Sequence, residues 1–280
     1  MPSRRQRQMC IRDRYNNIQS MKQEIKFYMR SWKIDLFNKE KKLCNIYHAC
    51  IQKTGSQWIK AVFSDSRVQK YSGLVCYPQK RYEYKGLPKK IPKYTFCPRL
   101  YIPYYLYEEI EKPEDYRTFY VIRYPRNVVI SWYYSMLQTH PIMGNVSNYR
   151  TRLRSMTFED GITYCIKRLH VKFAYLRSWM NRNDDNQLLI VKFEDMTNSP
   201  NQEFKKLFEH CKIDIPNRKF NEILEDYSKE NMRKRDLARR KYKSESHYRI
   251  QSSNWKDVFT SRHEELFNTI NGDLLKVLNY

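Results

Sequence analysis

Short apolar runs, each followed by a stretch with helical periodicity, recur along this chain. The first run covers residues 43–50, and after a polar interruption residues 58–63 form the apolar side of a helix. The same order returns at residues 118–137 and at residues 187–211. Apolar runs that are joined by helices are typical of parallel strands with crossover connections. The pattern therefore predicts an α/β fold in which a central parallel sheet is flanked by helices.

The length of 280 residues suffices for one sizeable core, and we expect a single domain over residues 43–280. Residues 1–14 carry five arginines and almost no apolar periodicity, which is typical of a disordered basic tail or of a leader foreign to the domain. Residues 15–42 are expected to be partly helical and to lead into the first strand. Prolines and tyrosines interrupt residues 64–118, where several short segments around a cleft would suit the composition.

The composition limits the classes of protein that the chain can belong to. Hydrophobic residues make up 41% of it, which is typical of a globular protein, and a formal net charge of +23 favours an anionic partner. No run approaches the roughly 18 apolar residues of a membrane span, and the N-terminus lacks an apolar signal core. Seven cysteines without Cys-x-x-Cys or zinc spacing indicate reduced thiols. We therefore expect a cytoplasmic protein without a metal site.

The polar interruption after the first apolar run reads Lys53-Thr54-Gly55-Ser56 and lies where a strand passes into a helix. Unpaired backbone N–H groups at a helix start bind anions, together with the positive end of the helix dipole. Gly55 allows close approach of the backbone, and Lys53 adds a positive charge. Thr54 and Ser56 add hydroxyl donors. The expected ligand is a phosphate or sulfate group.

This loop is not a Walker A loop, because its lysine precedes its single glycine. Lys-Thr-Gly-Ser-Gln-Trp instead resembles the Lys-Ser-Gly-Thr-Thr-Trp loop of sulfotransferases that use 3′-phosphoadenosine 5′-phosphosulfate (PAPS). The resemblance implies that Lys53 contacts the oxygen between sulfate and 5′-phosphate, where it stabilises the departing 3′-phosphoadenosine 5′-phosphate (PAP). It also implies that Trp58 stacks on adenine and that the 5′-phosphate is held by Thr54, Gly55, Ser56 and Gln57.

Arg123 ends the second apolar run, at the carboxyl end of a strand, where open α/β sheets bind ligands. Ser131 follows eight residues later, and the pair resembles the Arg and Ser that bind the 3′-phosphate in sulfotransferases. A guanidinium fork and a hydroxyl can satisfy several phosphate oxygens together. Two such motifs in the right order are more specific than either motif alone.

Three further segments resemble sulfotransferase motifs. Phe193 lies in Lys-Phe-Glu-Asp-Met, with phenylalanine in place of the usual tyrosine. Ser228 lies in a segment similar to the one near the adenine, and Arg249 lies in a shortened form of the family's Arg-Lys-Gly segment. The resemblance covers about residues 43–265 and implies the P-loop-like sulfotransferase fold. It places Phe193, Ser228 and Arg249 at the cofactor.

Sulfuryl transfer is an in-line displacement that relies on positioning and electrostatics and requires no metal, and a general base takes the acceptor's proton. The resemblance aligns Phe96 with the histidine that is the base in cytosolic members. Glu83 and His48 are the remaining candidates, because other branches carry a glutamate near position 83 and His48 lies just before the loop. Two alternatives stay open: the acceptor is acidic enough to react with little help from a base, or the protein is inactive.

We expect a PAPS-dependent sulfotransferase with a hydroxyl or amine acceptor, either a small molecule or a glycan, and no nucleic acid partner. A P-loop kinase is disfavoured, because Gly-Lys-Ser/Thr does not occur. The main alternative is a catalytically impaired basic module that binds acidic glycan or nucleic acid on the same fold. Lys256, Thr260 and Glu265 partly match a dimer motif of cytosolic members, so a homodimer stays open.

Overall fold

The computed structural model describes residues 21, 25, 27–29, 45–78, 86, 88–142, 144–182, 186–239 and 254–280. The predicted tail at 1–14 and most of the lead-in at 15–42 lie outside this part of the chain. Phe27 of the lead-in is buried in the core, with its ring edge against Tyr77 at a centroid distance of 5.7 Å. No helix among the described residues is long and apolar enough to cross a membrane.

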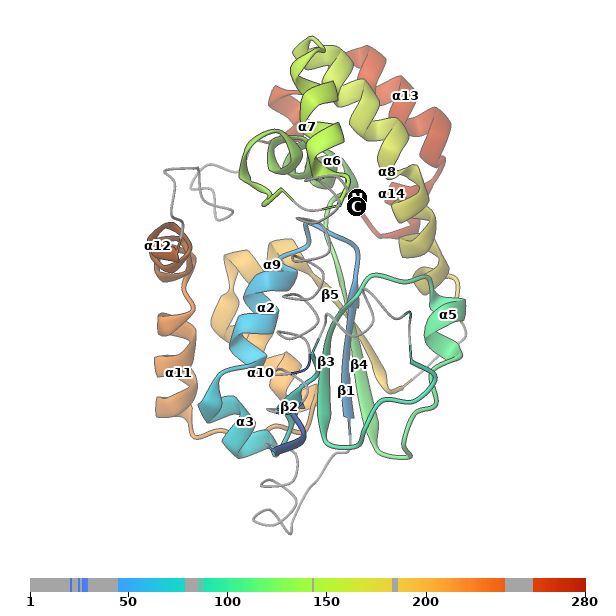
Figure 1. Cartoon of the computed structure of the whole chain (residues 1–280). Coiled ribbons are helices and arrows are strands. Elements are labelled where there is room, and N and C mark those ends of the chain that lie inside the picture. Colours follow the sequence, from blue (N-terminus) through green and yellow to red (C-terminus); the bar gives the residue numbers. More distant parts are fainter. Residues whose placement is uncertain are drawn as a thin grey trace, which may run out of the picture.

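The described strands form one parallel sheet in the order β2-β3-β1-β4-β5 (Figure 1). They are β1 (Asn45–Cys50), β2 (Val75–Cys76), β3 (Thr95–Leu100), β4 (Tyr116–Ile122) and β5 (Leu188–Lys192). Strand β1 pairs with β3 on one side and with β4 on the other, so the strand before the Lys53 loop is central. The predicted α/β fold with a central parallel sheet is confirmed.

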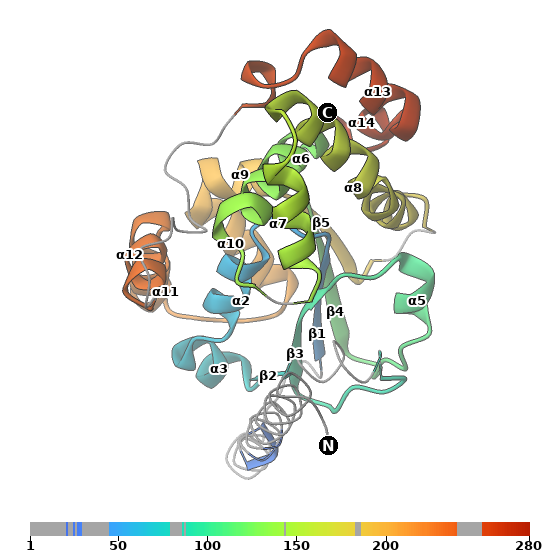
Figure 2. The same ribbon diagram turned by 45° about the horizontal axis from the view of Figure 1, so that its top comes forward.

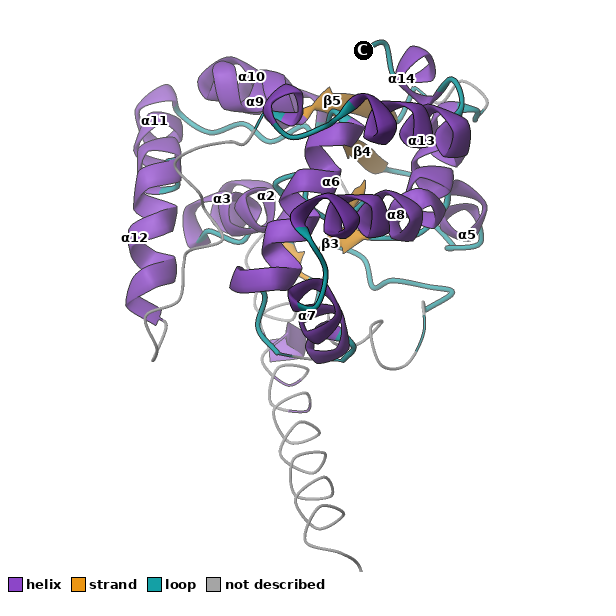
Figure 3. Ribbon diagram, turned by 90° about the horizontal axis from the view of Figure 1, so that it is seen from above, coloured by secondary structure: helices purple, strands orange, loops and turns teal. Residues whose placement is uncertain are grey.

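Helices cover both faces of this sheet (Figure 3). The described helices are α2 (Ser56–Phe63), α3 (Ser66–Ser72), α5 (Tyr104–Glu108), α6 (Pro125–Tyr134), η1 (Ser135–Thr139), α7 (Val146–Arg154), α8 (Phe158–Met180), α9 (Phe193–Asn198), α10 (Pro200–His210), α11 (Asn217–Asp226), α12 (Lys229–Arg239), η2 (Trp255–Asp257), α13 (Ser261–Asn271) and α14 (Leu274–Val277). Helices α2, α3, α10 and α11 lie on one side of the sheet, and α5, α8, α13 and α14 lie on the other.

Alternate residues of each strand enter two separate cores. In β1, Ile46 and Cys50 join the core under α2 and α10, whereas Tyr47 and Ala49 join the core under α8. A parallel sheet that is covered on both faces is apolar at nearly every position. This burial explains why the strands read as continuous apolar runs in the sequence.

The longest described helix, α8, covers Phe158–Met180, and the Thr157 side chain caps its start by accepting a hydrogen bond from the Asp160 N–H. Residues 64–118, which the sequence leaves unassigned, contain β2 and β3. Strand β3 does not read as a strand because it contains Pro98 and the left-handed Arg99 (φ 59°), at a shift in its register with β1.

Because all strands run the same way, the segments that follow β1, β3, β4 and β5 meet at one edge of the sheet. Helices α6 and α7 lie beyond this edge (Figures 1 and 2). Open α/β sheets bind their ligands at the carboxyl ends of the strands. We therefore expect the site residues predicted from the sequence to lie at this edge of the sheet.

Candidate anion-binding and transfer site

The loop between β1 and α2 has the backbone of an anion cradle. Lys53 (φ 73°) and Gly55 (φ 75°) both adopt the left-handed conformation, which brings the chain sharply into α2 at Ser56. The buried Thr54 hydroxyl donates to the Ile51 carbonyl at 2.9 Å and holds the loop to the end of β1. The first N–H groups of α2 thus open toward the carboxyl edge of the sheet, where the helix dipole is positive.

Phe193 closes one side of the cradle. A Cβ atom on Gly55 would lie 2.5 Å from Cε2 of Phe193, closer than real contacts allow. Glycine is therefore required here by the left-handed backbone and by the packing of this ring. Phe193 opens α9 directly after β5, as the sequence predicts, and its ring also lies 4.7 Å from the Arg123 guanidinium carbon.

Arg123 follows β4 and reaches back to the cradle. Its Nη1 donates to the Lys53 carbonyl at 2.8 Å, which ties the end of β4 to the loop after β1. Its Nε is buried without a hydrogen-bond partner among the described residues. Burial lowers the pKa of Arg123, and the nearby Glu194 acts in the opposite direction. A guanidinium that is poorly hydrated and has an unpaired N–H is well suited to an anionic ligand.

The end of β4 is braced by Glu194. One carboxylate oxygen accepts a hydrogen bond from the Tyr124 N–H at 3.0 Å, and the other accepts one from the Tyr280 hydroxyl at 2.7 Å. The Tyr280 ring packs edge-on against Tyr124 at 5.1 Å. These contacts hold the backbone directly after Arg123 in place.

The other predicted cofactor residues lie around this cradle. Ser131 is half-buried in α6, which begins two residues after Arg123. Trp58 packs edge-on against Phe204 of α10 at 5.0 Å, with its buried Nε1 lacking a partner among the described residues. Ser228 precedes α12, whose first residue, Lys229, has a pKa lowered by burial and by the charge of Arg123. Gln57 is exposed in the first turn of α2.

The structure does not bring His48 to the site. The side chain is fully buried in β1, stacked on Phe119 at 4.8 Å and on Phe96 at 6.5 Å. Burial lowers its pKa to about 3, and the charge of Arg99 contributes. Its alternation along β1 turns it into the core under α2, so the structure lends no support to His48 as the base, and that role stays a prediction from the sequence.

Phe96 is likewise remote from the acceptor. It is buried in β3 opposite Ile46, in the first half of β1, and it stacks on Phe63 at 4.7 Å. At the carboxyl end of β3 the chain instead presents Tyr101, whose hydroxyl lies 2.8 Å from Oγ of Ser56. The alignment of Phe96 with the family's catalytic histidine is therefore displaced along the strand, and the residue that reaches the cradle from β3 is Tyr101.

Sequence reasoning did not single out His140, which follows η1. Its pKa is lowered by burial and by the charges of Lys53 and Arg150, although its own hydrogen bond to the Pro141 carbonyl acts in the opposite direction. Lys53 and His140 are thus electrostatic neighbours across 87 residues of chain, and no local motif marks the pair. Two predicted residues, Glu83 and Arg249, lie outside the described residues.

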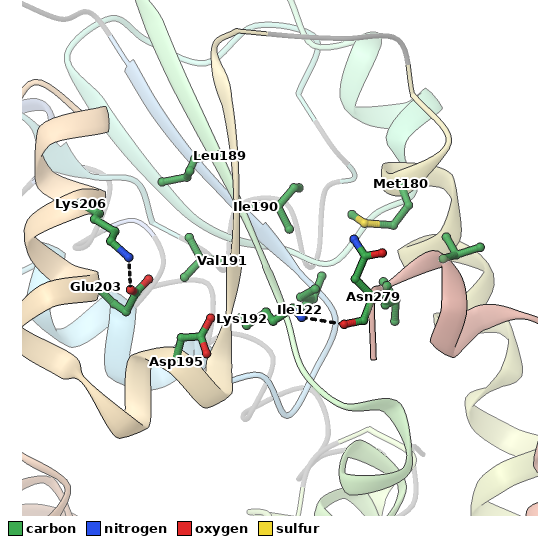
Figure 4. A pocket seen from close by; sticks show the side chains of 12 residues that line it. Ile122, Met180, Leu189, Ile190, Val191, Lys192, Asp195, Glu203, Lys206 and Asn279 are labelled. Atoms are coloured by element: carbon green, nitrogen blue, oxygen red, sulfur yellow. Dashed lines mark hydrogen bonds and ion pairs between the residues drawn. The ribbon is translucent and has the colours of Figure 1, made fainter.

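A hollow of about 440 Å³ lies at the outer edge of β5 rather than at the cradle (Figure 4). Its lining is mostly aliphatic along β5. Among its charged residues, Lys206 pairs with Glu203 at 2.5 Å and Lys192 donates to the Asn279 carbonyl at 2.8 Å. It offers no unpaired cation like Arg123 among its described lining residues, so the cradle is the candidate site. No group of His, Cys, Asp or Glu within the described ranges could hold a metal ion.

An anion cradle at the carboxyl edge of a parallel sheet is typical of α/β proteins that bind phosphate or sulfate groups. The family model "Sulfotransferase domain" matches residues 46–278, and the chain belongs to this family. The alternative of a basic binding module without turnover finds no support in the comparisons with known proteins.

Among curated proteins, sulfotransferase 1 family member D1 of Mus musculus is 26% identical over 164 residues, covering 55% of this chain and 52% of that protein. Sulfotransferase 1A1 of Mus musculus is 24% identical over 201 residues, covering 66% of both. The chain thus spans about half to two thirds of the length of these curated relatives.

Two solved structures are similar over most of this chain. Mouse sulfotransferase SULT7A1 complexed with PAP has a TM-score of 0.56 at 16% identity, covering 89% of this chain and 91% of that chain. Retinol dehydratase in complex with androsterone and the inactive cofactor PAP has a TM-score of 0.55 at 14% identity, covering 83% and 80%. The predicted sulfotransferase fold is confirmed.

Proposed function

We propose that this chain is a PAPS-dependent sulfotransferase that transfers a sulfuryl group to a hydroxyl or amine by in-line displacement. The observation that supports this proposal most strongly is the set of contacts that Arg123 makes and leaves unmade. It links β4 to the left-handed loop through the Lys53 carbonyl, and it keeps a buried Nε–H that has no partner among the described residues. Such an arrangement fits an anion with several acceptor oxygens, as a phosphorylated nucleotide supplies.

The predicted cofactor-binding residues have the following roles in this proposal. PAPS supplies the activated sulfuryl group. Lys53 places its ammonium where negative charge grows on the leaving oxygen, and the 3′-phosphate contacts Arg123 and Ser131. The 5′-phosphate is held by Thr54, Gly55, Ser56 and Gln57. The adenine side of the site is formed by Trp58, Phe193 and Ser228.

Arg249 is proposed to join Arg123 at the 3′-phosphate. Trp255, six residues further along the chain, anchors to the start of α6: its backbone N–H donates to Oδ1 of Asn127 at 3.1 Å, and its ring stacks on Tyr124 at 5.6 Å. Arg126 lies over the other part of the same indole, 4.2 Å from its centroid, and pairs with Glu264 at 3.1 Å. This anchorage beside Arg123 supports the assignment of Arg249.

We propose a small-molecule or glycan acceptor and a reducing, cytoplasmic compartment. The described cysteines are Cys50, Cys76, Cys97, Cys165 and Cys211, all free thiols, which suits such a compartment. A homodimer is proposed through Lys256 and Glu265, which are both exposed, whereas Thr260 has a role within the chain because it forms a capping box with His263 at the start of α13.

A thermal-shift titration with PAP tests the cofactor assignment, with ATP and ADP as controls. A ligand that binds only the folded state stabilises it by about 2.7 kcal/mol at a hundred times its Kd. We expect PAP to stabilise the wild type strongly and Arg123→Ala weakly, and ATP and ADP to have little effect. Arg117→Ala is the matched control, because Arg117 lies near the amino end of the same strand, away from the cradle.

The outcome that contradicts the assignment is equally clear. If no 3′-phosphorylated nucleotide shifts the wild type, or if Arg117→Ala weakens the shift as much as Arg123→Ala, then the cradle does not bind this cofactor. An alternative function as a basic module would then show binding to any polyanion that falls steeply with salt.

A further inference from the structure

Helices α7 and α8 carry cations that rest on tyrosine rings of the neighbouring helix. The Arg152 guanidinium of α7 lies over the Tyr164 ring of α8, with its central carbon 4.7 Å from the ring centroid. In the opposite direction, the Arg168 guanidinium of α8 lies over the Tyr149 ring of α7 at 5.5 Å, and its Nη2 donates to the Tyr149 hydroxyl at 2.8 Å. Each helix thus supplies a cation and a ring to the other.

The arrangement continues along α8 beyond Arg168. Lys172 lies one turn further, and its Nζ is 4.6 Å from the centroid of the Tyr175 ring. Residues three and four apart are neighbours on a helix, so these residues and Tyr164 lie along one stripe of α8. We call the whole arrangement the cation–tyrosine row, and its members are Tyr149, Arg152, Tyr164, Arg168, Lys172 and Tyr175.

The row is anchored to the body of the protein, while its charges face solvent. The Tyr149 ring packs edge-on against Trp132 of α6 at 5.4 Å, and Trp132 is buried. Arg150, the next residue of α7, bonds to carbonyl groups of the segment around η1. Arg152 and Arg168 are both exposed. Cations that are already held on rings lose little conformational entropy when they bind a ligand.

The exposed cations on the other side of the sheet are paired differently (Figure 3). Lysines and arginines of α10 and α11 form salt bridges with a carboxylate of their own helix, as in the pairs Lys206–Glu203, Arg218–Glu222 and Lys219–Glu222. Such compensation gives a surface of mixed charge, which needs no partner.

The cation–tyrosine row lacks this compensation. Helix α7 contains no acidic residue, and α8 contains none after Glu159 and Asp160 in its first turn. In the described part of the chain, none of the three cations of the row forms a salt bridge with a carboxylate. Like charges four residues apart, such as Arg168 and Lys172, also destabilise a helix slightly. The row is therefore a concentrated positive surface, which favours an anionic partner.

The chemistry of the row narrows the kind of partner. Protein–protein interfaces are depleted of charged residues at their centre, whereas this surface has its charges there. Single-stranded nucleic acids stack their bases on free aromatic rings, whereas these tyrosine rings already have cations over them. Guanidinium and ammonium groups form charge-assisted hydrogen bonds with sulfate and carboxylate groups. A polymer that carries such groups at close intervals fits the row.

We propose that the cation–tyrosine row binds an acidic polysaccharide through Arg152, Arg168 and Lys172, and that a hydroxyl or amine of this polysaccharide is the acceptor. The inference rests on the proposed sulfuryl transfer and narrows its acceptor to an anionic glycan. Helix α7 lies beyond the carboxyl edge of the sheet, where the cradle is (Figures 1 and 2). A polymer is long enough to occupy the row and this edge together.

The row contributes binding and orientation to the transfer, which is the one proposed above. The sugar oxygen or nitrogen forms the new bond to sulfur and releases its hydrogen as a proton to the solvent. The S–O bond to PAP breaks, and its electron pair leaves with PAP.

The binding test uses a fluorescently labelled heparin oligosaccharide as probe and fluorescence anisotropy as readout. The row variant is Arg152→Gln/Arg168→Gln/Lys172→Gln. The matched control variant changes exposed cations of α11 and α12 and is Arg218→Gln/Lys219→Gln/Lys234→Gln. Both variants lower the formal net charge of +23 equally, so their comparison separates the row from long-range attraction.

We expect the Kd of the row variant for this probe to rise about 10–100-fold, because three exposed ion pairs contribute a few-fold each. The Kd of the control variant should change less than about threefold, because salt screens distant charges. The dependence of log Kd on log salt should become shallower in the row variant, by about one unit for each contact removed. The PAP thermal shift should be unchanged in both variants.

The kinetic test uses N-desulfated heparin as acceptor, since it offers hydroxyl and amine groups and keeps most of its negative charges. At saturating PAPS, we expect the row variant to raise the KM for this acceptor by a similar factor and to leave kcat and the KM for PAPS unchanged. A loss of kcat at saturating acceptor would show a role other than binding and would contradict the proposal. So would a wild type that turns over a small phenol and no acidic polysaccharide.

The binding test has its own contradicting outcomes. An equal loss in the row and control variants would attribute binding to net charge alone. Tighter binding of duplex DNA or of phosphatidylserine vesicles than of the heparin probe at the same salt would assign the row to another partner. Each of these results overturns the proposal.

Folding and cofactor binding are checked separately. If the row variant does not unfold cooperatively, Lys172→Gln replaces it, with Lys234→Gln as control, and a rise of a few-fold in Kd is expected for Lys172→Gln alone. Heparin binding is measured without nucleotide, so a wild type that binds no PAP contradicts the proposed function and not the polysaccharide surface.

Discussion

The two halves of this site are built in different ways. The half that is proposed to bind anions is made of three short segments, each of which contains a strand end and the first turn of the next helix: β1 with α2, β4 with α6, and β5 with α9. The other half, proposed as the acceptor half, joins distant segments: the Tyr101 hydroxyl after β3 lies 2.8 Å from Oγ of Ser56, and Arg150 on α7 holds the backbone of η1. The first half uses local backbone geometry and leaves local motifs, whereas the second depends on contacts between distant segments and leaves none.

Two histidines show the same difference between position in the sequence and position in space. His48 lies five residues before Lys53 in sequence but is buried and stacked between phenylalanines, with a pKa of about 3. His140 is far from Lys53 in sequence but is its electrostatic neighbour. Proximity to the cradle along the chain therefore does not predict proximity in space, because successive side chains of a strand point to opposite faces. The predictions below test this contrast, beginning with the largest effect.

The largest expected effect concerns His48 and acid stability. The folded-state pKa of about 3 lies below the ordinary 6.5, so only the unfolded chain takes up a proton between these values. The free energy of unfolding of the wild type should fall as the pH drops from 6.5 toward 3, by about 5 kcal/mol in total for this group. His48→Phe, which keeps a stacked ring, should lack this loss. Urea unfolding at several pH values measures it.

His170→Phe, at an exposed position of α8, is the control and should leave the pH dependence unchanged. His48→Phe should also keep the PAP shift and the turnover of the wild type. A loss of turnover in a stably folded His48→Phe protein would restore this residue as a candidate base and would contradict its assignment to the core.

The second prediction concerns Gly55 of the cradle and the Phe193 ring that packs against it. In Gly55→Ala, the new Cβ would meet the Phe193 ring at 2.5 Å on a left-handed backbone. We expect a loss of about 2–4 kcal/mol of stability from strain and overpacking, together with loss of PAP binding. Gly144→Ala is the matched control, because Gly144 is also left-handed (φ +51°) but has no atom within 4 Å of a new Cβ, and so measures the backbone term alone.

The difference in stability between Gly55→Ala and Gly144→Ala measures the effect of the contact with Phe193. Gly55→Ala combined with Phe193→Ala should recover part of the stability, because the clashing ring is removed. If the double variant is no more stable than Gly55→Ala alone, the glycine is required only for its backbone conformation and Phe193 does not close the cradle.

The smallest effect concerns the acceptor half. In Arg150→Lys, a point charge replaces a guanidinium that bonds the Met136 and His140 carbonyls. We expect the KM for the acceptor to rise about tenfold, equivalent to one lost charge-assisted hydrogen bond, while the PAP shift stays unchanged. Steady-state kinetics at saturating PAPS measures it, with Arg154→Lys, exposed in the last turn of α7, as control. A weaker PAP shift with an unchanged acceptor KM would place η1 in the cofactor half.

The regular parts of the fold could be predicted from the sequence. Thr157 and a long apolar period mark α8, and three apolar runs mark β1, β4 and β5. Strand β3 could not be predicted, because Pro98 and the left-handed Arg99 interrupt its apolar pattern. Pairing with β1 and β2 nevertheless holds it in the sheet. That omission also misplaced the acceptor segment, since the carboxyl end of β3 carries Tyr101 and not Phe96 to the cradle.

The sequence by itself determined the anion half of this protein. A left-handed glycine before a helix, a lysine beside it and an arginine at a strand end act within a few residues of one another, and their geometry follows from local backbone rules. Only the tertiary structure decided what surrounds that half. The bonds from Arg150 on α7 to the backbone of η1 and the contact between Tyr101 and Ser56 join distant segments, whereas strand alternation buries His48 in the core. Both outcomes depend on long-range packing, which no local pattern encodes.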